Sequence, residues 1–224
     1  MSGKDLPASL KARILADAPK VRPRRGLPLA LLGLVATAWA VTFAVLYGRR
    51  SNWSTLPESA TWLTLAELAV LAAIVSVTTL ARGRTMLGPT ARWLFVASTA
   101  PVVAFAGVAL TTTPAAQPVP PERFLAAAAG CDASVVLAAV PLLALLLWQQ
   151  RDRILASPGR VGAVAGIAAA AWGHVLLHWS CPWTDLQHVM FGHVLPAIPL
   201  AISGAILARW LQRRRTSSKI ATPD

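Results

Sequence analysis

The residues best suited to chemistry in this sequence are its four histidines, its two cysteines and two acids inside apolar segments. His174, His178 and Cys181 are spaced i, i+4, i+7, so they share one face of a helix if that helix extends to Cys181. Two imidazoles and a thiol on one face are a candidate ligand set for a transition metal or a haem. The structural alternative is a hydrogen-bonded contact between two helices, which uses the same side chains.

Cys131, Glu67 and Asp132 extend this set. Two cysteines are too few for a disulfide-rich scaffold, but Cys131 and Cys181 could form one disulfide if the segment of Cys131 lies beside the end of the segment before Cys181. An ionised carboxylate inside a bilayer costs a few kcal/mol, so Glu67 and Asp132 are expected to be protonated or paired, with a histidine as the natural partner. The two acids indicate either a proton- or metal-sensitive switch or polar contacts that hold helices together.

Composition decides which elements must position these side chains. Of the 224 residues, 55% are hydrophobic and only 13% are charged, with a mean hydropathy of +0.56, which disfavours a soluble globular protein. Six apolar segments are each close to the length that crosses a bilayer as a helix, and they lack the polar face of a soluble bundle. The sequence therefore predicts an all-α, polytopic membrane protein. The six segments are Gly26–Tyr47, Ala60–Ala81, Trp93–Thr113, Phe124–Trp148, Val161–Ser180 and Met190–Ala208.

The positive charges predict the orientation. All but three of the 21 lysines and arginines fall on one side of the six predicted helices, the exceptions being Arg49, Arg50 and Arg123. By the positive-inside rule both termini are cytoplasmic, as expected for a multi-pass protein of a bacterial inner membrane. Topology thus explains the net charge of +12 without direct nucleic-acid binding, and the basic face is suited to anionic lipid.

This topology gives three parts and gathers the reactive side chains in one place. Residues 1–25 form a cytoplasmic arm, residues 26–208 a six-helix transmembrane domain, and residues 209–224 a cytoplasmic basic tail. All of the histidines and cysteines, and both intramembrane acids, fall in the outer half of the predicted bundle. They are Glu67, Cys131, Asp132, His174, His178, Cys181, His188 and His193.

The N-terminal arm contains a short amphipathic pattern. Leu6, Leu10 and Ile14 follow one another at i, i+4 steps, with Leu15 beside them, and Pro19 ends the predicted helix. Such a helix either lies on the membrane surface or docks into a groove on a cytoplasmic protein. The arm holds no catalytic constellation, so we expect a binding function and no enzymatic activity.

The order of these motifs resembles the six-helix membrane anti-sigma factors, the negative regulators of extracytoplasmic-function sigma factors. The resemblance covers nearly the whole chain, and its Ala-rich composition and length are similar to the light-response members that control carotenoid synthesis. That narrower similarity implies light, acting through an excited porphyrin or singlet oxygen, as the signal. The matching positions are Leu6-Pro7, Leu10, Arg13 to Leu15, Cys131, Arg160-Val161-Gly162 to Gly166, and His178 to Pro182.

The resemblance implies that the arm binds a sigma factor and releases it on an external signal sensed at the outer side. The expected sigma-binding residues are Leu6, Leu10, Arg13, Ile14 and Leu15. The expected sensing residues are Cys131, Cys181, His174, His178, His193, Glu67 and Asp132, with Cys131 and Cys181 matching the family's paired signal-responsive cysteines. No cofactor is required, although a metal ion or a tetrapyrrole would suit the outer side.

Two other functions are compatible with the sequence. The first is a haem or copper redox protein that uses His174, His178 and His193. The second is a small transporter with Glu67 and Asp132 in its pathway, although we find no clear inverted repeat between the two halves. Neither of these functions needs the amphipathic arm.

Overall fold

A computed structural model describes residues 29–49, 66, 119–151, 157–183 and 185–220. Every element in this part of the chain is helical. The N-terminal arm, Glu67 and the two predicted segments Ala60–Ala81 and Trp93–Thr113 lie outside the described residues, apart from Ala66, which is helical. The all-α prediction is therefore confirmed for the described part, which includes four of the six predicted segments.

Three of the helices occur close to where the apolar segments predict them. Helix α2 (Leu29–Tyr47) ends at the predicted residue, where Gly48 adopts a left-handed φ of +69° and its N–H bonds to the Ala44 carbonyl at 2.9 Å. Helix α5 (Phe124–Gln150) follows a 3-10 turn, η4 (Pro121–Arg123), and starts at the predicted residue. Helix α6 (Pro158–Ser180) begins earlier than predicted, because Pro158 is suited to the first turn of a helix.

The last predicted segment differs most from the structure. It consists of a short helix α7 (Leu186–Val189), a π-helical turn η5 (Met190–Val194) and helix α8 (Ala197–Ile220), where one helix over Met190–Ala208 was expected. The helix also continues through most of the predicted tail, as far as Ile220. Pro196 explains the break, because it has no N–H to give the Gly192 carbonyl and so cannot continue an α-helix without interruption.

Three segments among the described residues are long and apolar enough to cross a membrane: Pro121–Gln150, Pro158–Ser180 and Leu186–Arg214. A shorter apolar helix covers Gly33–Tyr47. Many large apolar side chains lie exposed on α2, α5 and α8, such as Leu125 at 80% and Val45 at 76%. An apolar surface of this kind suits lipid, where the helices satisfy their own backbone groups and the side chains need no polar cover.

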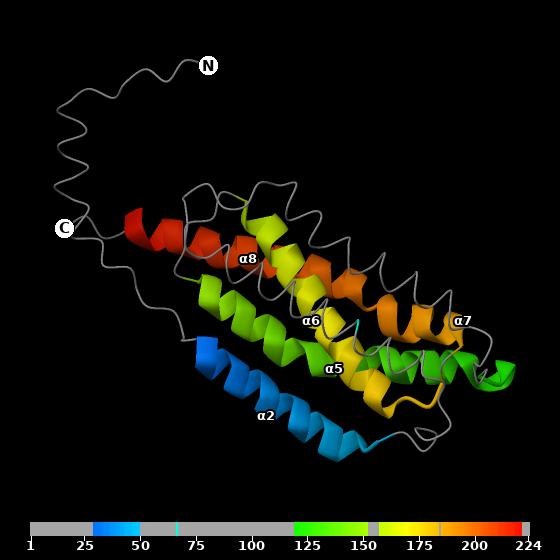
Figure 1. The fold of residues 1–224 in the computed structure, drawn as a ribbon. Coiled ribbons are helices and arrows are strands. Elements are labelled where there is room, and N and C mark those ends of the chain that lie inside the picture. Colours follow the sequence, from blue (N-terminus) through cyan, green and yellow to red (C-terminus); the bar gives the residue numbers. More distant parts are fainter. Residues whose placement is uncertain (1–28, 50–65, 67–118, 152–156, 184, 221–224) are drawn as a thin grey trace, which may run out of the picture.

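Helix α6 packs most extensively on α8 and α5, and it also contacts α2 (Figure 1). Its glycines allow close approach: a Cβ on Gly162 would collide with the Gly204 carbonyl, and one on Gly166 with the Leu200 carbonyl, both on α8. The predicted role of this G-x-x-x-G pair in helix packing is thus confirmed. Gly173 similarly faces the Val135 carbonyl on α5, at 2.5 Å from its ideal Cβ.

Helix α2 packs against both α5 and α6. The Trp39 indole N–H donates to the Ala138 carbonyl of α5 at 2.9 Å. Phe43, 1% exposed, packs with Ala138 and with Leu176 of α6. The bundle thereby holds α5 and α6 side by side up to the end of α6, which positions the site described below.

We expect Gly162→Ala to destabilise the bundle by about 1–3 kcal/mol, because the added methyl group meets backbone that cannot move aside. The matched control is Gly130→Ala on α5, where a Cβ would have no neighbouring atom of the described residues within 4 Å and should leave stability unchanged or slightly raised. Thermal unfolding of both variants in detergent micelles measures the difference. Equal stability of the two variants would contradict the packing described for α6 and α8.

Candidate functional site

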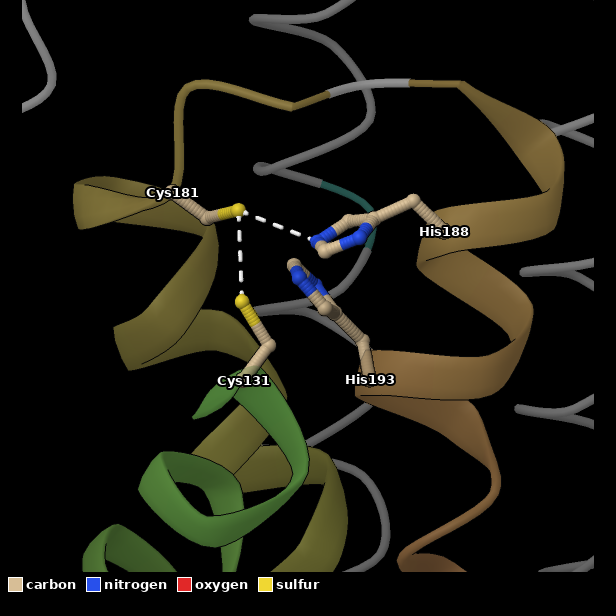
Figure 2. A group of neighbouring side chains, drawn as sticks. All are labelled: Cys131, Cys181, His188 and His193. Atoms are coloured by element: carbon tan, nitrogen blue, oxygen red, sulfur yellow. Dashed lines mark hydrogen bonds between the residues drawn. The ribbon is translucent and has the colours of Figure 1, made fainter. Parts of the chain in front are cut away.

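Four side chains from separate elements converge where α5 begins and α6 ends. Cys131 comes from α5, Cys181 directly follows α6, His188 lies on α7 and His193 lies in η5. Figure 2 shows all four pointing toward one another. We call these residues the thiol–imidazole cluster. Their sulfur and nitrogen ligand atoms all lie within 4.8 Å of one another.

The Cys181 sulfur has close contacts with three neighbouring groups. It lies 3.6 Å from Cys131 Sγ and 3.4 Å from His188 Nε2, and it also contacts the Trp183 carbonyl at 3.7 Å. Cys181, His188 and His193 are almost completely inaccessible, at 4%, 0% and 1% exposed, whereas Cys131 is half-buried. Both cysteines are free thiols at this separation. The condition set for a Cys131–Cys181 disulfide, adjacency of the two segments, is met.

The end of α6 determines where Cys181 points. The Cys181 N–H still bonds to the Leu177 carbonyl at 2.8 Å, but its ψ of 123° is extended. Pro182 follows, and a residue before proline is disfavoured in the helical region. The expected single helix face of His174, His178 and Cys181 is therefore corrected, because the helix stops one residue too early and Cys181 turns toward Cys131.

The π-helical turn η5 aligns the other two members. In a continuous α-helix, residues five apart such as His188 and His193 point about 140° away from each other. In the wider turn the Leu195 N–H bonds to the Met190 carbonyl, five residues back, at 3.0 Å. The two imidazoles come together, with ring centroids 5.3 Å apart.

Asp185 and Gly192 bring these elements against α5. The Asp185 carboxylate caps α7 by accepting from the His188 N–H at 2.9 Å, and it also accepts from the Val119 N–H, before α5, at 3.3 Å. Gly192 leaves room for α5, because a Cβ there would lie 3.1 Å from the Cys131 Cβ and 3.3 Å from the Ala128 carbonyl. The Asp185 carboxylate and the absence of a side chain at Gly192 thus allow α7 and η5 to lie close enough to α5 for the imidazoles to reach the thiols.

A second group shares one member with the cluster. His174 and His178 of α6 join His193 in a three-histidine group, whose ligand atoms also lie within 4.8 Å of one another. The His174 ring stacks on His178 with centroids 6.1 Å apart and meets His193 edge-on at 5.1 Å. All three histidines are buried. His193 therefore stands between a mixed thiol–imidazole site and an all-imidazole site.

The two predicted acids are not part of either group among the described residues. Asp132 is half-buried next to Cys131, and it belongs to neither set of ligand atoms. Glu67 lies outside the described residues, as do the predicted sigma-binding residues of the arm. The structure therefore gathers five of the seven predicted sensing residues, and it adds His188.

Sequence reasoning placed His188 in the outer connection without assigning it a role. The sequence feature that could have indicated its role is the spacing of Cys181, His188 and His193. In an α-helix these three residues do not share one face, and the π-helical turn is needed to bring them together. Pro196 is the residue in the sequence that indicates such a turn, since it removes the α-helical hydrogen bond to Gly192.

The surroundings of Cys181 favour its neutral form. Its contact with the Cys131 sulfur and its burial both raise the pKa of the Cys181 thiol, while His188 acts in the opposite direction. A buried thiolate beside a second sulfur needs a compensating positive charge. A cation that binds here must displace the protons of the thiols.

The comparisons with known proteins assign the chain at the family level. The family model described as "Negative regulator of sigma F" (NrsF) matches residues 12–213, nearly the whole chain. This match includes Cys131, Cys181 and all four histidines. No curated protein and no solved structure gives a significant match.

Proposed function

Because the chain belongs to the NrsF family of negative regulators of sigma F, we propose that it sequesters an extracytoplasmic-function sigma factor at the bacterial inner membrane. The family assignment makes it a negative regulator of a sigma factor. A sigma factor must reach RNA polymerase to act, so holding it at a membrane is sufficient to repress its genes. Three helical segments that are long and apolar enough to cross a bilayer support the membrane anchor.

In this proposal residues 1–25 bind the sigma factor from the cytoplasmic side. Leu6, Leu10, Ile14 and Leu15 form the apolar stripe of the arm, and Arg13 lies beside it. An apolar stripe of this kind fits a groove on a protein partner. The excess of Lys and Arg on one side of the predicted helices supports cytoplasmic termini.

The thiol–imidazole cluster is the proposed receiver of the signal, and its geometry is the observation that carries this part. It joins α5, the connection after α6, and η5, so a chemical change at the two sulfurs pulls on three parts of the bundle. The altered packing weakens the hold of the arm on the sigma factor, as a population shift between two states. Thiol-reactive agents are the expected class of signal. Singlet oxygen, generated by light, belongs to this class and would link the chain to carotenoid synthesis.

The mechanism requires binding and release without catalysis, and it requires no tetrapyrrole. The three-histidine group is the specific observation that keeps a haem redox protein as a second candidate. An absorption spectrum of the purified protein separates the two functions. A Soret band at one haem per chain would favour the redox protein, and its absence favours the regulator.

Direct capture of the sigma factor tests the proposal. The full-length chain, purified from membranes in mild detergent, should recover one sigma factor from the host's cytoplasmic proteins, identified by mass spectrometry. The matched control is the chain without residues 1–25, which should recover none. Recovery of no sigma factor by the full-length chain, or equal recovery by both, would contradict the proposed function.

A further inference from the structure

We propose that Cys131, Cys181, His188 and His193 form a tetrahedral site for one divalent ion of the zinc class. This site gives the proposed signal a chemical target. Its link to release of the sigma factor rests on the proposed function, whereas the metal site itself does not. The site has two thiols and two imidazoles, which is the donor set of closed, four-coordinate zinc sites. Thiolates and imidazoles prefer such ions to the oxygen-seeking Mg²⁺ or Ca²⁺.

The distances between the donors fit a tetrahedron around a metal ion. With metal–sulfur bonds of about 2.3 Å and metal–nitrogen bonds of about 2.0–2.1 Å, tetrahedral ligand atoms lie roughly 3.3–3.8 Å apart. Two of the six separations among the donors, 3.6 Å between the sulfurs and 3.4 Å from Cys181 Sγ to His188 Nε2, fall in this range, and all six lie within 4.8 Å. A disulfide would instead bring the sulfurs to about 2.05 Å.

The charge and the burial of the cluster also favour a bound divalent ion. Two thiolates and one divalent cation together carry no net charge, so a metal ion makes this donor set compatible with a buried site. His188 is 0% exposed and directs Nε2 at the Cys181 sulfur. Its backbone N–H is held by Asp185, which fixes the start of α7 and so the position from which the imidazole reaches the site.

The donor chemistry selects this site over the three-histidine group. Both sets use His193, and a neutral imidazole has one unprotonated nitrogen for a metal ion, so one ion occupies one set at a time. Two charged thiolates attract a divalent cation more strongly than neutral imidazoles do, and the cluster offers four ligands where the three-histidine group offers three. The ion therefore takes the thiol–imidazole cluster, and His174 and His178 remain beside it as neighbours of His193.

A bound ion would link three parts of the chain that are far apart along the sequence. It would link α5 through Cys131, the α6–α7 connection through Cys181, and α7 with η5 through the two imidazoles. An oxidant that takes two electrons from the two thiolates would release the ion and join the sulfurs as a disulfide, which pulls these parts into a different packing. Serines at both positions cannot be joined in this way, so repression remains without the ion. The defined target of the proposed signal is thus the metal–thiolate bonds.

The test measures metal in the full-length protein, purified in detergent after growth with zinc. We expect about one zinc ion per chain in the wild type, none in the Cys131→Ser, Cys181→Ser double variant, and one in the His174→Gln, His178→Gln control. Wild-type protein without zinc, zinc retained by the cysteine variant, or zinc lost from the histidine control would each overturn the proposal. Replacing zinc with Co²⁺ in the wild type adds a measurement independent of variant folding, because sulfur-to-cobalt charge-transfer absorption reports thiolate ligation. Its absence from cobalt-loaded protein would also overturn the proposal.

Capture of the sigma factor by the same preparation separates this inference from the proposed function. Zinc-free wild-type protein that still captures the sigma factor would refute the metal site alone. Zinc-loaded protein that captures none would refute the proposed function and leave the metal site intact.

Discussion

Deleting residues 1–25 is expected to leave the target genes of the sigma factor permanently transcribed, at the level found in cells without the whole protein. The arm carries the apolar stripe proposed to bind the sigma factor, so its loss removes the binding free energy that holds the sigma factor. Each 1.4 kcal/mol lost weakens binding tenfold, and an apolar helix in a groove contributes several such steps. We therefore expect uninduced transcription to rise more than about tenfold. A reporter fused to a target promoter measures it.

Point substitutions in the arm sharpen this experiment. Leu10→Ala with Ile14→Ala removes two members of the apolar stripe and should reproduce most of the deletion's effect. The matched control is Lys11→Ala, which lies off the stripe and should repress like the wild type. Immunodetection of the chain in the membrane fraction establishes that each variant is present. Full repression by the deletion variant would show that the arm does not hold the sigma factor.

Replacing either cysteine by serine is expected to leave repression intact and abolish induction. Serine is close to cysteine in size but is neither oxidised by thiol-reactive agents nor a good ligand for soft metal ions. A coupling of about 1–3 kcal/mol between sites changes affinity roughly 5- to 150-fold, which sets the size of the induction that should be lost. The measurement is reporter induction in Cys131→Ser and Cys181→Ser cells challenged in turn with an oxidant, a soft divalent metal, and light with a photosensitiser.

Ser134→Ala provides the control on the same helix. The Ser134 hydroxyl donates to the Gly130 carbonyl within α5 and lies outside the thiol–imidazole cluster, so this variant should respond like the wild type. Normal induction of the double cysteine variant by every agent would remove the thiols from the mechanism. Loss of the response to light alone would show that the thiols receive the light signal and not the other two.

The positions of α2 and α5 could be predicted from the sequence, because the length of an apolar segment is a local signal, and α2 ends and α5 begins at the predicted residues. Helix α6 begins at Pro158 and not at the predicted Val161, because proline suits a first turn, and α8 continues beyond the predicted Ala208 to Ile220. The G-x-x-x-G packing of Gly162 and Gly166 was also predicted, although its partner α8 could be named only from the fold.

The sequence predicted most of the residues of the candidate site, but it did not predict which of them lie together. Sequence spacing placed Cys181 with His174 and His178, whereas Pro182 ends the helix and turns Cys181 toward Cys131. His188 and His193 meet because the chain makes a π-helical turn just before Pro196, a change of backbone that α-helical periodicity does not predict. The close approach of α5 to η5 depends on Gly192, which has no side chain to keep them apart. The sequence alone does not show that these two elements are neighbours.

The location of the sigma factor in unstressed cells tests the central claim most directly. Cells that contain the full-length chain are broken and separated into membrane and soluble fractions, and the sigma factor is quantified in both. We predict that most of the sigma factor sediments with the membranes when the full-length chain is present and moves to the soluble fraction when residues 1–25 are deleted. A sigma factor that is soluble in both strains, while its genes remain repressed by the full-length chain, would contradict sequestration at the membrane.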